Sequence, residues 1–240
     1  MLFRSKATLE NAGKLLGQAR EFDPAKAEGE VRICMTEYCS AILLPALYDV
    51  LRERAPNIRL WSTPSYRQSI DAGLRNSSFD IAIGALATSS PDFRRSELFH
   101  ERTVCLLDKR HPAVKRATKN KLRREDLVAS PHVKVSIYRD RDSLVDEGLH
   151  VAGLQIPSEI TVGQYLLVPR LLKNRDLLYL CGENFARLVA PQHQLTILDL
   201  PIRMPGVSIR QVWHRRTDAD PLLVWLRDQV TTIVARAVTH

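Results

Sequence analysis

Hydrophobic and polar positions at residues 31–62 follow the order of a strand, a turn, a helix and a second strand. Residues 31–35 are mainly apolar, residues 36–40 are mostly polar, and leucines then recur at helical spacing. Pro45 fits such a helix only near its first turn, where the missing N–H costs little. The pattern predicts a βαβ unit whose polar turn lies at the carboxyl end of the first strand. Ligands of open α/β sheets collect at that edge, and the N–H groups of a starting helix attract anions there.

The rest of the chain repeats this alternation in two cycles. Strands are expected at residues 58–62, 79–86, 103–107, 132–138, 159–163, 177–181, 195–200 and 207–213. Helices are expected at residues 5–21, 67–75, 141–152, 164–174, 183–190 and from Asp220 onward, and a loop is expected around Ser89. Because strands alternate with helices, the sheets are expected to be mainly parallel. The two cycles predict two α/β lobes with a cleft between them.

The first 30 residues differ from the rest. Residues 5–21 have leucines at helical spacing, but the apolar stripe is too narrow for such a helix to be stable by itself. It is expected to pack on another surface, such as a partner chain, and residues 26–30 are expected to be a linker. No apolar run approaches the roughly 18 residues that a membrane span needs, and the N-terminus does not resemble a secretory signal. We therefore expect no membrane partner and a cytoplasmic location.

The net charge of +8 admits a polyanionic partner, but its distribution favours another interpretation. The basic residues are dispersed, with the densest groups at 94–95, 119–124 and 214–216. We therefore favour a solvated surface, with a nucleic-acid interface as the alternative. The four cysteines form no CxxC pair and three lie in apolar segments, so buried free thiols are expected rather than a metal or redox site.

Motifs for cofactor binding and catalysis are missing from the sequence. The chain has no GxSxG, GxGxxG, GxxxxGK[ST] or HExxH motif, and its seven histidines show no i, i+2 or i, i+4 pairing. We expect no metal, no cofactor and no catalytic residues, although residues distant in the sequence can still form a catalytic set.

An ordered series of segments resembles one family. The resemblance is carried by FDPA followed by VRI, by LLPALYDVLRERAPNIRL and FDIAIGAL, by HPAV, HVKVS and VDEGLHVAGL, and by VPRLLKNRDLLYL and VWHRRTDADPLLVWLR. Each segment is weakly specific, but their order from about Phe22 to the C-terminus resembles the effector-binding portion of LysR-type transcriptional regulators. The resemblance is greatest to the branch that contains the NodD and NahR regulators of nodulation and aromatic catabolism.

The resemblance implies a fold similar to that of type-2 periplasmic binding proteins. Two Rossmann-like lobes would enclose a cleft, with residues 31–102 plus 207–240 in the first lobe and residues 103–206 in the second. Residues 1–30 would be a remnant of the linker helix and linker, and two crossover strands, near Thr103 and near Leu200, would form the hinge. The alternation of elements also predicts two lobes, whereas the discontinuous boundary comes from the family alone.

Two departures from the family pattern are visible. Family members normally begin with a winged helix-turn-helix domain, and only a piece of the linker helix precedes Phe22 here. We therefore expect contact with DNA only through a winged helix-turn-helix that this chain lacks. The branch also tends to have Val-Pro-His-Phe where this chain has VGQY at 162–165, and a proline near Gly182. The branch's effector is therefore not carried over to this chain.

The cleft is expected to be lined by the turns that follow the strands. The residues expected to bind ligand are Thr36, Glu37, Tyr38, Ser65, Tyr66, Gly84, Ala85 and Leu86 in the first lobe and His132, Val133, Gly163, Gln164 and Tyr165 in the second. Hydroxyls and N–H groups at helix starts suit a carboxylate or phenolic oxygen, and Tyr38 and Tyr165 are candidates to flank an aromatic ring. Simpler roles stay open: Thr36 as a helix cap, both tyrosines as packing residues and His132 as a buried, hydrogen-bonded ring. Glu37 would repel a carboxylate, so it either points away or binds a donor.

Together these observations predict a ligand-sensing module. A small aromatic or carboxylic inducer would bind between the lobes, and its different affinity for two lobe arrangements would control a homodimer or tetramer. The alternative is an enzyme that uses the same two-lobed scaffold on a small organic acid, because a fold does not fix a function. A clustered acid, base and nucleophile with shifted pKa values would indicate the enzyme. Polar anchors with apolar walls would indicate sensing.

Overall fold

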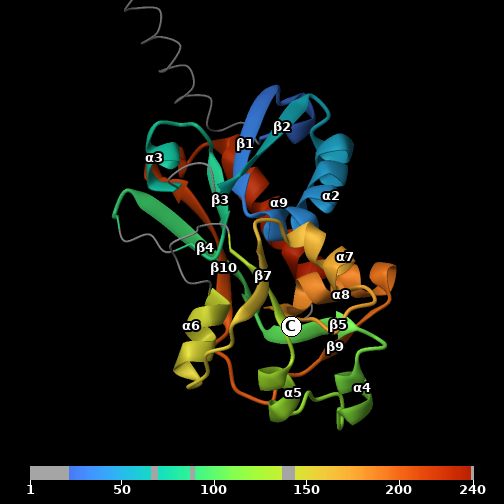
Figure 1. The fold of residues 1–240 in the computed structure, drawn as a ribbon. Helices are drawn as coiled ribbons and strands as arrows, with labels where there is room; N and C mark the ends of the chain where they lie inside the picture. Colours follow the sequence, from blue (N-terminus) through green and yellow to red (C-terminus); the bar gives the residue numbers. More distant parts are fainter. Residues whose placement is uncertain (1–21, 66–69, 87–89, 137–143, 239–240) are drawn as a thin grey trace, which may run out of the picture.

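Figure 1 shows that the chain folds into two lobes, each built around a five-stranded sheet with helices packed on it. The computed structural model describes residues 22–65, 70–86, 90–136 and 144–238. The helix expected at 5–21 lies outside the described residues, as does the start of the helix expected at 67–75. The predicted α/β fold with two lobes is confirmed.

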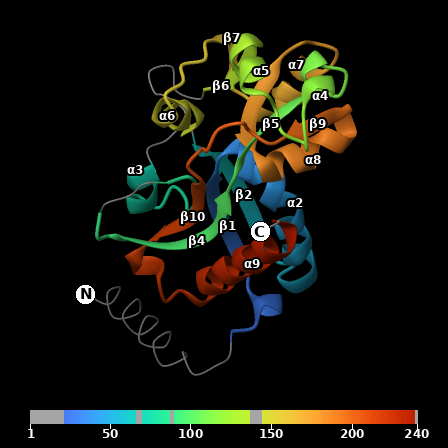
Figure 2. The same ribbon diagram turned by 90° about the horizontal axis from the view of Figure 1, so that it is seen from below.

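The first lobe contains the sheet with strand order β2-β1-β3-β10-β4. Its strands are β1 (Gly29–Met35), β2 (Ile58–Pro64), β3 (Ile81–Gly84), β4 (Phe93–Glu101) and β10 (Val207–His214). β1 pairs in parallel with β2 and β3, whereas β10 is antiparallel to β3 and β4. The helices are α2 (Glu37–Arg54), α3 (Ile70–Arg75) and α9 (Pro221–Ala237), with the 3-10 turns η2 (Pro24–Lys26) and η5 (Arg215–Thr217). In Figure 2, α9 crosses below the strands beside α2, against which it packs.

The second lobe contains the sheet with strand order β7-β6-β8-β5-β9. Its strands are β5 (Thr103–Asp108), β6 (His132–Val135), β7 (Ser158–Val162), β8 (Leu178–Gly182) and β9 (Leu195–Leu198). β6 is parallel to β7 and β8, whereas β5 is antiparallel to β8 and β9. The helices are α4 (Pro112–Arg116), α5 (Arg124–Ala129), α6 (Leu144–Val151), α7 (Val168–Leu172) and α8 (Glu183–His193), with the 3-10 turn η4 (Tyr165–Leu167).

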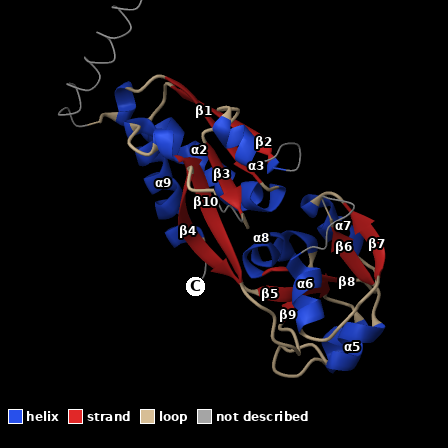
Figure 3. Cartoon of the chain, turned by 90° about the vertical axis from the view of Figure 1, so that its left-hand side faces the viewer, coloured by secondary structure: helices blue, strands red, loops and turns tan. Residues whose placement is uncertain are grey.

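The chain passes between the lobes twice, from β4 to β5 and from β9 to β10, as Figure 3 shows. Arg102 alone separates β4 from β5, and residues 199–206 connect β9 to β10. The two crossings lie side by side because β4 pairs with β10, with Glu101 opposite Val207. The lobe limits implied by the family resemblance stay a prediction, which these adjacent crossings support.

The expectation of mainly parallel sheets was wrong. Each sheet has two parallel and two antiparallel pairings. The strands next to the crossings are linked directly across the lobes, without the helical connection that parallel neighbours need. β4 was missed because it is an edge strand whose sequence, FRRSELFHE, is largely polar, with only Phe93, Phe99 and Glu101 buried. β4 lies between the strands predicted at residues 79–86 and 103–107, where only a loop was expected.

Helix α2 begins earlier than the sequence pattern predicted. Thr36 has an extended backbone and caps the helix, so that residues 37–40 form its first turn rather than a preceding loop. Pro45 therefore lies in the helix interior and not in the first turn, which corrects the expectation from the sequence. The proline leaves the carbonyl of Ala41 without its usual helical N–H partner.

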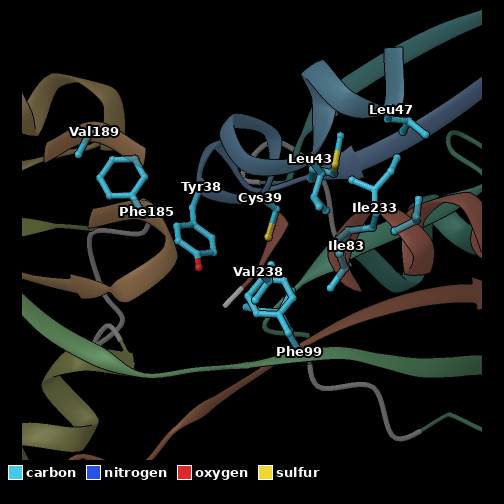
Figure 4. Packing of buried hydrophobic residues seen from close by; sticks show 14 of the residues in the cluster. Tyr38, Cys39, Leu43, Leu47, Ile83, Phe99, Phe185, Val189, Ile233 and Val238 are labelled. Carbon is cyan, nitrogen blue, oxygen red and sulfur yellow. The ribbon is translucent and has the colours of Figure 1, made fainter. Parts of the chain in front are cut away.

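The hydrophobic core is continuous across the two lobes. Tyr38 and Cys39 on α2 belong to the same buried cluster as Phe185 and Val189 on α8. Figure 4 shows the ring of Tyr38 between Cys39 and Phe185 at the point where the two helices meet. All four cysteines are buried free thiols, as predicted. This shared core holds the first turn of α2 against the second lobe.

Candidate ligand-binding site between the two lobes

A cavity of about 350 Å³ lies between the lobes. It is lined by the start of α2, the turn after β3 and part of β10 in the first lobe, and by β6, α6 and β8 in the second. Glu101 and Thr103, on either side of the first crossing, and Val207, which directly follows the second, also line it. Because strands of both sheets and residues next to both crossings contribute to the wall, a molecule bound here would contact both lobes close to where the chain passes between them.

Most of the residues predicted from the sequence do line this cavity. Those at its wall are Thr36, Tyr38, Ser65, Ala85, Leu86, His132, Val133 and Tyr165. They come together because the turns after β1, β2 and β3 meet the second lobe at one edge of the first sheet, as the βαβ pattern predicted. Their role in binding ligand stays a prediction.

Four other predicted residues are not among those that line the cavity. Glu37 instead accepts a hydrogen bond from the backbone N–H of Tyr165 at 2.6 Å, so it ties the first lobe to the second. Gly84 lies behind Thr36, whose Cγ2 would be 3.4 Å from a Cβ at that glycine. Gly163 and Gln164 are exposed on the loop after β7. Tyr66 lies outside the described residues.

The sequence did not predict the cavity-lining residues that lie on strands and helices. These are Ile70, Glu101, Thr103, Lys134, Val135, Ser136, Val145, Asp146, Leu149, Ile156, Ser158, Tyr179, Leu180, Cys181, Gly182, Val207 and Ile209. Local sequence patterns indicate ligand positions in the turns that follow strands, whereas most of these residues belong to strands and helices. Glu101 had one usable signal, an acidic residue next to the crossing at Thr103 that the family resemblance implied.

Thr36 caps the amino end of α2. The Oγ1 atom accepts a hydrogen bond from the backbone N–H of Cys39 at 3.2 Å, which settles the open question in favour of a helix cap. The same side chain lines the cavity. Capping and cavity lining are therefore combined in one residue at the amino end of the helix.

Three aromatic rings meet where α2, η4 and α8 converge. The ring centroids of Tyr38 and Tyr165 are 6.1 Å apart, and each lies 6.0 Å from the ring of Phe185. These are distances of direct ring contact, so the two tyrosines pack on each other in this structure rather than standing on either side of a gap. Burial raises the pKa of the Tyr165 phenol to about 12, so this ring stays neutral.

Glu101 is a buried carboxyl at the hinge, with an exposed fraction of 5%. It accepts a hydrogen bond from the Tyr38 hydroxyl and others from the backbone N–H and the amide group of Asn184, both at 3.1 Å. Burial raises the pKa of Glu101, and the hydrogen bonds from Asn184 oppose that rise. The carboxyl therefore joins α2 of the first lobe to α8 of the second beside the first crossing.

His132 combines a structural role with a place at the cavity wall. Its Nε2 atom lies 2.8 Å from the backbone oxygen of Leu127, an atom that only accepts, so Nε2 carries the ring proton. Burial lowers the pKa of this ring, which favours the neutral form. The open alternative of a buried, hydrogen-bonded histidine is therefore confirmed. The neutral ring keeps Nδ1 as a hydrogen-bond acceptor.

The remaining polar groups of the cavity do not form a catalytic arrangement among the described residues. Lys134 and Asp146 form an ion pair at 2.6 Å. Burial raises the pKa of the Tyr179 phenol and the Cys181 thiol well above their ordinary values, so both keep their protons. Within residues 22–65, 70–86, 90–136 and 144–238, no three His, Cys, Asp or Glu side chains gather as metal ligands do. None of the helices in those ranges is long and apolar enough to cross a membrane.

Comparison with known proteins identifies relatives among transcriptional regulators. Residues 24–234 match the model of the LysR substrate binding domain. NagR of a Ralstonia species, an HTH-type transcriptional activator, is 26% identical over 90% of this chain and 70% of its own length. NahR of Pseudomonas putida, another such activator, is 27% identical over 86% of this chain and 67% of its own length. SyrM 1 of Sinorhizobium fredii is 28% identical over 87% of the chain and 61% of its own length.

Solved structures share the fold at lower sequence identity. The regulatory domain of MexT, a transcriptional activator in Pseudomonas aeruginosa, has a TM-score of 0.75 and 22% identity, with 87% of this chain and 100% of that one covered. A putative transcriptional regulator from Vibrio parahaemolyticus has a TM-score of 0.77 and 21% identity, with 90% and 99% covered. The chain therefore belongs to the LysR substrate binding domain family and is a ligand-sensing domain of the kind that LysR-type transcriptional regulators use.

Proposed function

We propose that the cavity between the lobes binds a small aromatic or carboxylic inducer. The observation that carries this proposal is that both lobes, together with residues next to both crossings, supply the wall of one cavity. Its volume of about 350 Å³ lies in the range of small-molecule sites, and its wall mixes apolar side chains with a few polar groups, as such sites do. Thr36 and Ser65 supply hydroxyls for a ligand oxygen, and Nδ1 of His132 suits a hydroxyl donor on the ligand.

Signalling would follow from contact with both lobes at once. An inducer that fits one lobe arrangement better than another shifts the population toward that arrangement. The hydrogen bond from Tyr165 to Glu37 and the contacts of Glu101 with Tyr38 and Asn184 hold the arrangement seen here. We propose that the shift is read by a second copy in a homodimer or tetramer, and that it reaches DNA through a winged helix-turn-helix domain. The site of action would then be the cytoplasm.

The alternative function, an enzyme on the same scaffold, fits the cavity less well. An enzyme needs a nucleophile or base whose pKa is matched to its task. The pKa values of the thiol of Cys181 and the phenols of Tyr165 and Tyr179 are raised by burial, which keeps these groups protonated and unreactive as nucleophiles. Glu101 already accepts hydrogen bonds from Tyr38 and Asn184. These groups favour a sensor over a catalyst.

A thermal-shift screen tests the proposal. Benzoate, 4-hydroxybenzoate, phenol and a flavonoid would each be titrated against the chain, because a ligand that binds only the folded state raises the melting temperature by mass action. We expect a concentration-dependent rise for one chemical series, with the compound recovered unchanged by chromatography. A rise accompanied by consumption of the compound would support the enzyme, and a flat response to all four compounds would contradict the proposed inducer class.

A further inference from the structure

The basic residues of the second lobe are concentrated in one segment. Residues 108–126 contain eight lysines and arginines against three acidic residues, a net charge of +5, whereas the whole chain has +8. All eight basic residues are exposed: Lys109, Arg110, Lys115, Arg116, Lys119, Lys121, Arg123 and Arg124. They occupy α4, the start of α5 and the turns around these helices. We call these eight residues the α4–α5 basic surface.

Two of the three acidic residues in this segment are buried and serve the fold. Asp108 has an exposed fraction of 2% and accepts hydrogen bonds from the backbone N–H groups of Arg110 and Asn174, at 2.8 and 2.7 Å. Asp126, with an exposed fraction of 7%, accepts a hydrogen bond from Arg116 at 2.5 Å. The carboxylates thus point inward while the cations point outward, so the outer face is more positive than the sequence count suggests.

Most of these cations lack a carboxylate partner in the described part of the chain. Arg110 pairs with Asp108 at 3.5 Å and Arg116 pairs with Asp126 at 2.5 Å. The other six members of the surface form no ion pair with any carboxylate of the described residues. Unneutralised like charges on one face repel each other and raise the local concentration of anions.

The surface is held in a fixed shape at the far end of the second lobe. Figure 1 shows α4 and α5 on the side of that lobe away from the first sheet. The backbone N–H of Lys109 donates to the carbonyl of Gln194 at 3.3 Å, and that of Leu122 donates to the carbonyl of Asp199 at 2.9 Å. None of the eight residues lines the cavity. The surface is therefore available to a second partner while an inducer is bound.

We propose that the α4–α5 basic surface binds the phosphate backbone of duplex DNA without sequence preference. Lysine and arginine contacts to phosphate provide this kind of affinity. Lysine, which supplies four of the eight residues, is depleted at protein–protein interfaces, so an acidic protein fits less well. NagR and NahR are HTH-type transcriptional activators, and a DNA-binding domain of that type joined to this chain would bring the surface close to DNA. This contact is separate from any winged helix-turn-helix, so it departs from the expectation that DNA is contacted only through such a domain, and it does not depend on the identity of the inducer.

The main experiment compares two variants that lose the same charge from different places. The first replaces Lys115, Lys121, Arg123 and Arg124 with glutamine. The control replaces Arg59, Arg95, Arg203 and Arg236 with glutamine. These four residues are also exposed and have no ion pair among the described residues. Binding to a fluorescein-labelled duplex of about 20 base pairs with arbitrary sequence is followed by anisotropy between about 50 and 200 mM salt.

The unmodified chain should bind with an affinity that falls as salt rises, by roughly 100-fold over this range if about four phosphates are contacted. The first variant should lose at least about tenfold in affinity at low salt and lower the slope of log affinity against log salt by about 3 to 4, whereas the control should keep the slope. If both variants lost the same affinity for the duplex, binding would depend only on the net charge of the chain, and the proposal would be overturned. Failure of the unmodified chain to bind the duplex would also overturn it.

A second measurement needs no variant and so does not depend on how the variants fold. The unmodified chain would be acetylated with and without excess duplex, and the modified lysines counted by mass spectrometry. Lys109, Lys115, Lys119 and Lys121 should be protected by the duplex, whereas Lys26, an exposed lysine of η2 in the first lobe, should not. Protection that is uniform across all five lysines would contradict a defined surface.

Discussion

Gly182 offers a sharp test of how the hinge is packed. It is the last residue of β8, lines the cavity and lies against Glu101. A Cβ added at this position would come within 2.7 Å of Cγ and 2.8 Å of Cδ of Glu101, and within 3.0 Å of the Tyr38 hydroxyl. The backbone itself allows alanine, because Gly182 has φ of −62°. Gly182 is also the cap residue of α8, so the substitution Gly182→Ala combines the packing change with a small capping loss.

The magnitude follows from what must move. Glu101 is held by hydrogen bonds from Tyr38 and Asn184, so its side chain cannot swing aside without breaking them. Overpacking of this kind costs about 1–3 kcal/mol of unfolding free energy. For a chain of 240 residues that loss lowers the melting temperature by roughly 2–10 °C.

The matched control is Gly163→Ala. Gly163 is exposed, and a Cβ there would meet no atom within 4 Å. Its effect should stay within about 0.5 kcal/mol. Both variants would be measured by urea denaturation and thermal melting. The reasoning would be refuted if Gly182→Ala cost no more than Gly163→Ala, because Glu101 could not then lie against β8 as described.

A double variant locates the clash. Glu101→Ala removes the Cγ and Cδ atoms that the new Cβ would meet. In that background the loss of unfolding free energy caused by Gly182→Ala should be smaller by at least about 1 kcal/mol. If the cost of Gly182→Ala is the same in both backgrounds, its strain comes from somewhere other than Glu101.

Three further predictions concern pH, charge and the contact between the lobes. Burial lowers the pKa values of His111 and His132, so the unfolded chain binds protons below about pH 6.5 that the folded chain does not. The unfolding free energy from urea titration should therefore fall by at most about 1.4 kcal/mol per pH unit for each ring between pH 7 and 5, and His111→Asn with His132→Gln should remove this contribution; an unchanged slope would refute it. The raised pKa of Glu101 acts in the opposite direction, with stability lost as pH rises above about 4.5, so the comparison is made between variant and parent. Arg102→Ala breaks two ion pairs of a side chain that is 57% exposed, so it should cost only about 0–1 kcal/mol per pair and nothing in 1 M salt; a large loss that persists in salt would contradict this. Glu37→Gln weakens the 2.6 Å hydrogen bond to the second lobe and should lower the melting temperature by roughly 2–4 °C, against no change if that bond is not made in solution.

The first βαβ unit could be predicted because its local signals agree with its tertiary role. Strand β1 is apolar and buried, Thr36 is a good cap, and the helix that follows has its leucines on one face. The same agreement holds at the last helix, where Asp220 caps α9 through the N–H of Leu223 and Pro221 occupies the first position. These local rules placed much of the first-lobe side of the candidate site correctly.

The missed features depend on contacts that no local pattern records. β4 is polar because it is an edge strand, and its pairing with β10 joins residues more than 100 positions apart. The antiparallel pairings of both sheets follow from the two crossings, which alternation alone does not reveal. Glu101 is significant only because Tyr38 and Asn184 converge on it from separate lobes. The acidic residues that turn inward beneath the α4–α5 basic surface were likewise invisible in the sequence.

The measurement that tests the central claim most directly is calorimetric titration of a ligand into the unmodified chain and into a variant whose cavity is filled by a larger side chain. Ala85→Trp adds an indole at the cavity wall, whereas Ala235→Trp adds the same group to an exposed position of α9 outside the cavity. The compound that raises the melting temperature most in the screen would be titrated into the unmodified chain and both variants. The account predicts at least about a tenfold loss of affinity for Ala85→Trp and none for Ala235→Trp. Equal affinity in all three proteins would contradict the claim that the inducer binds between the lobes.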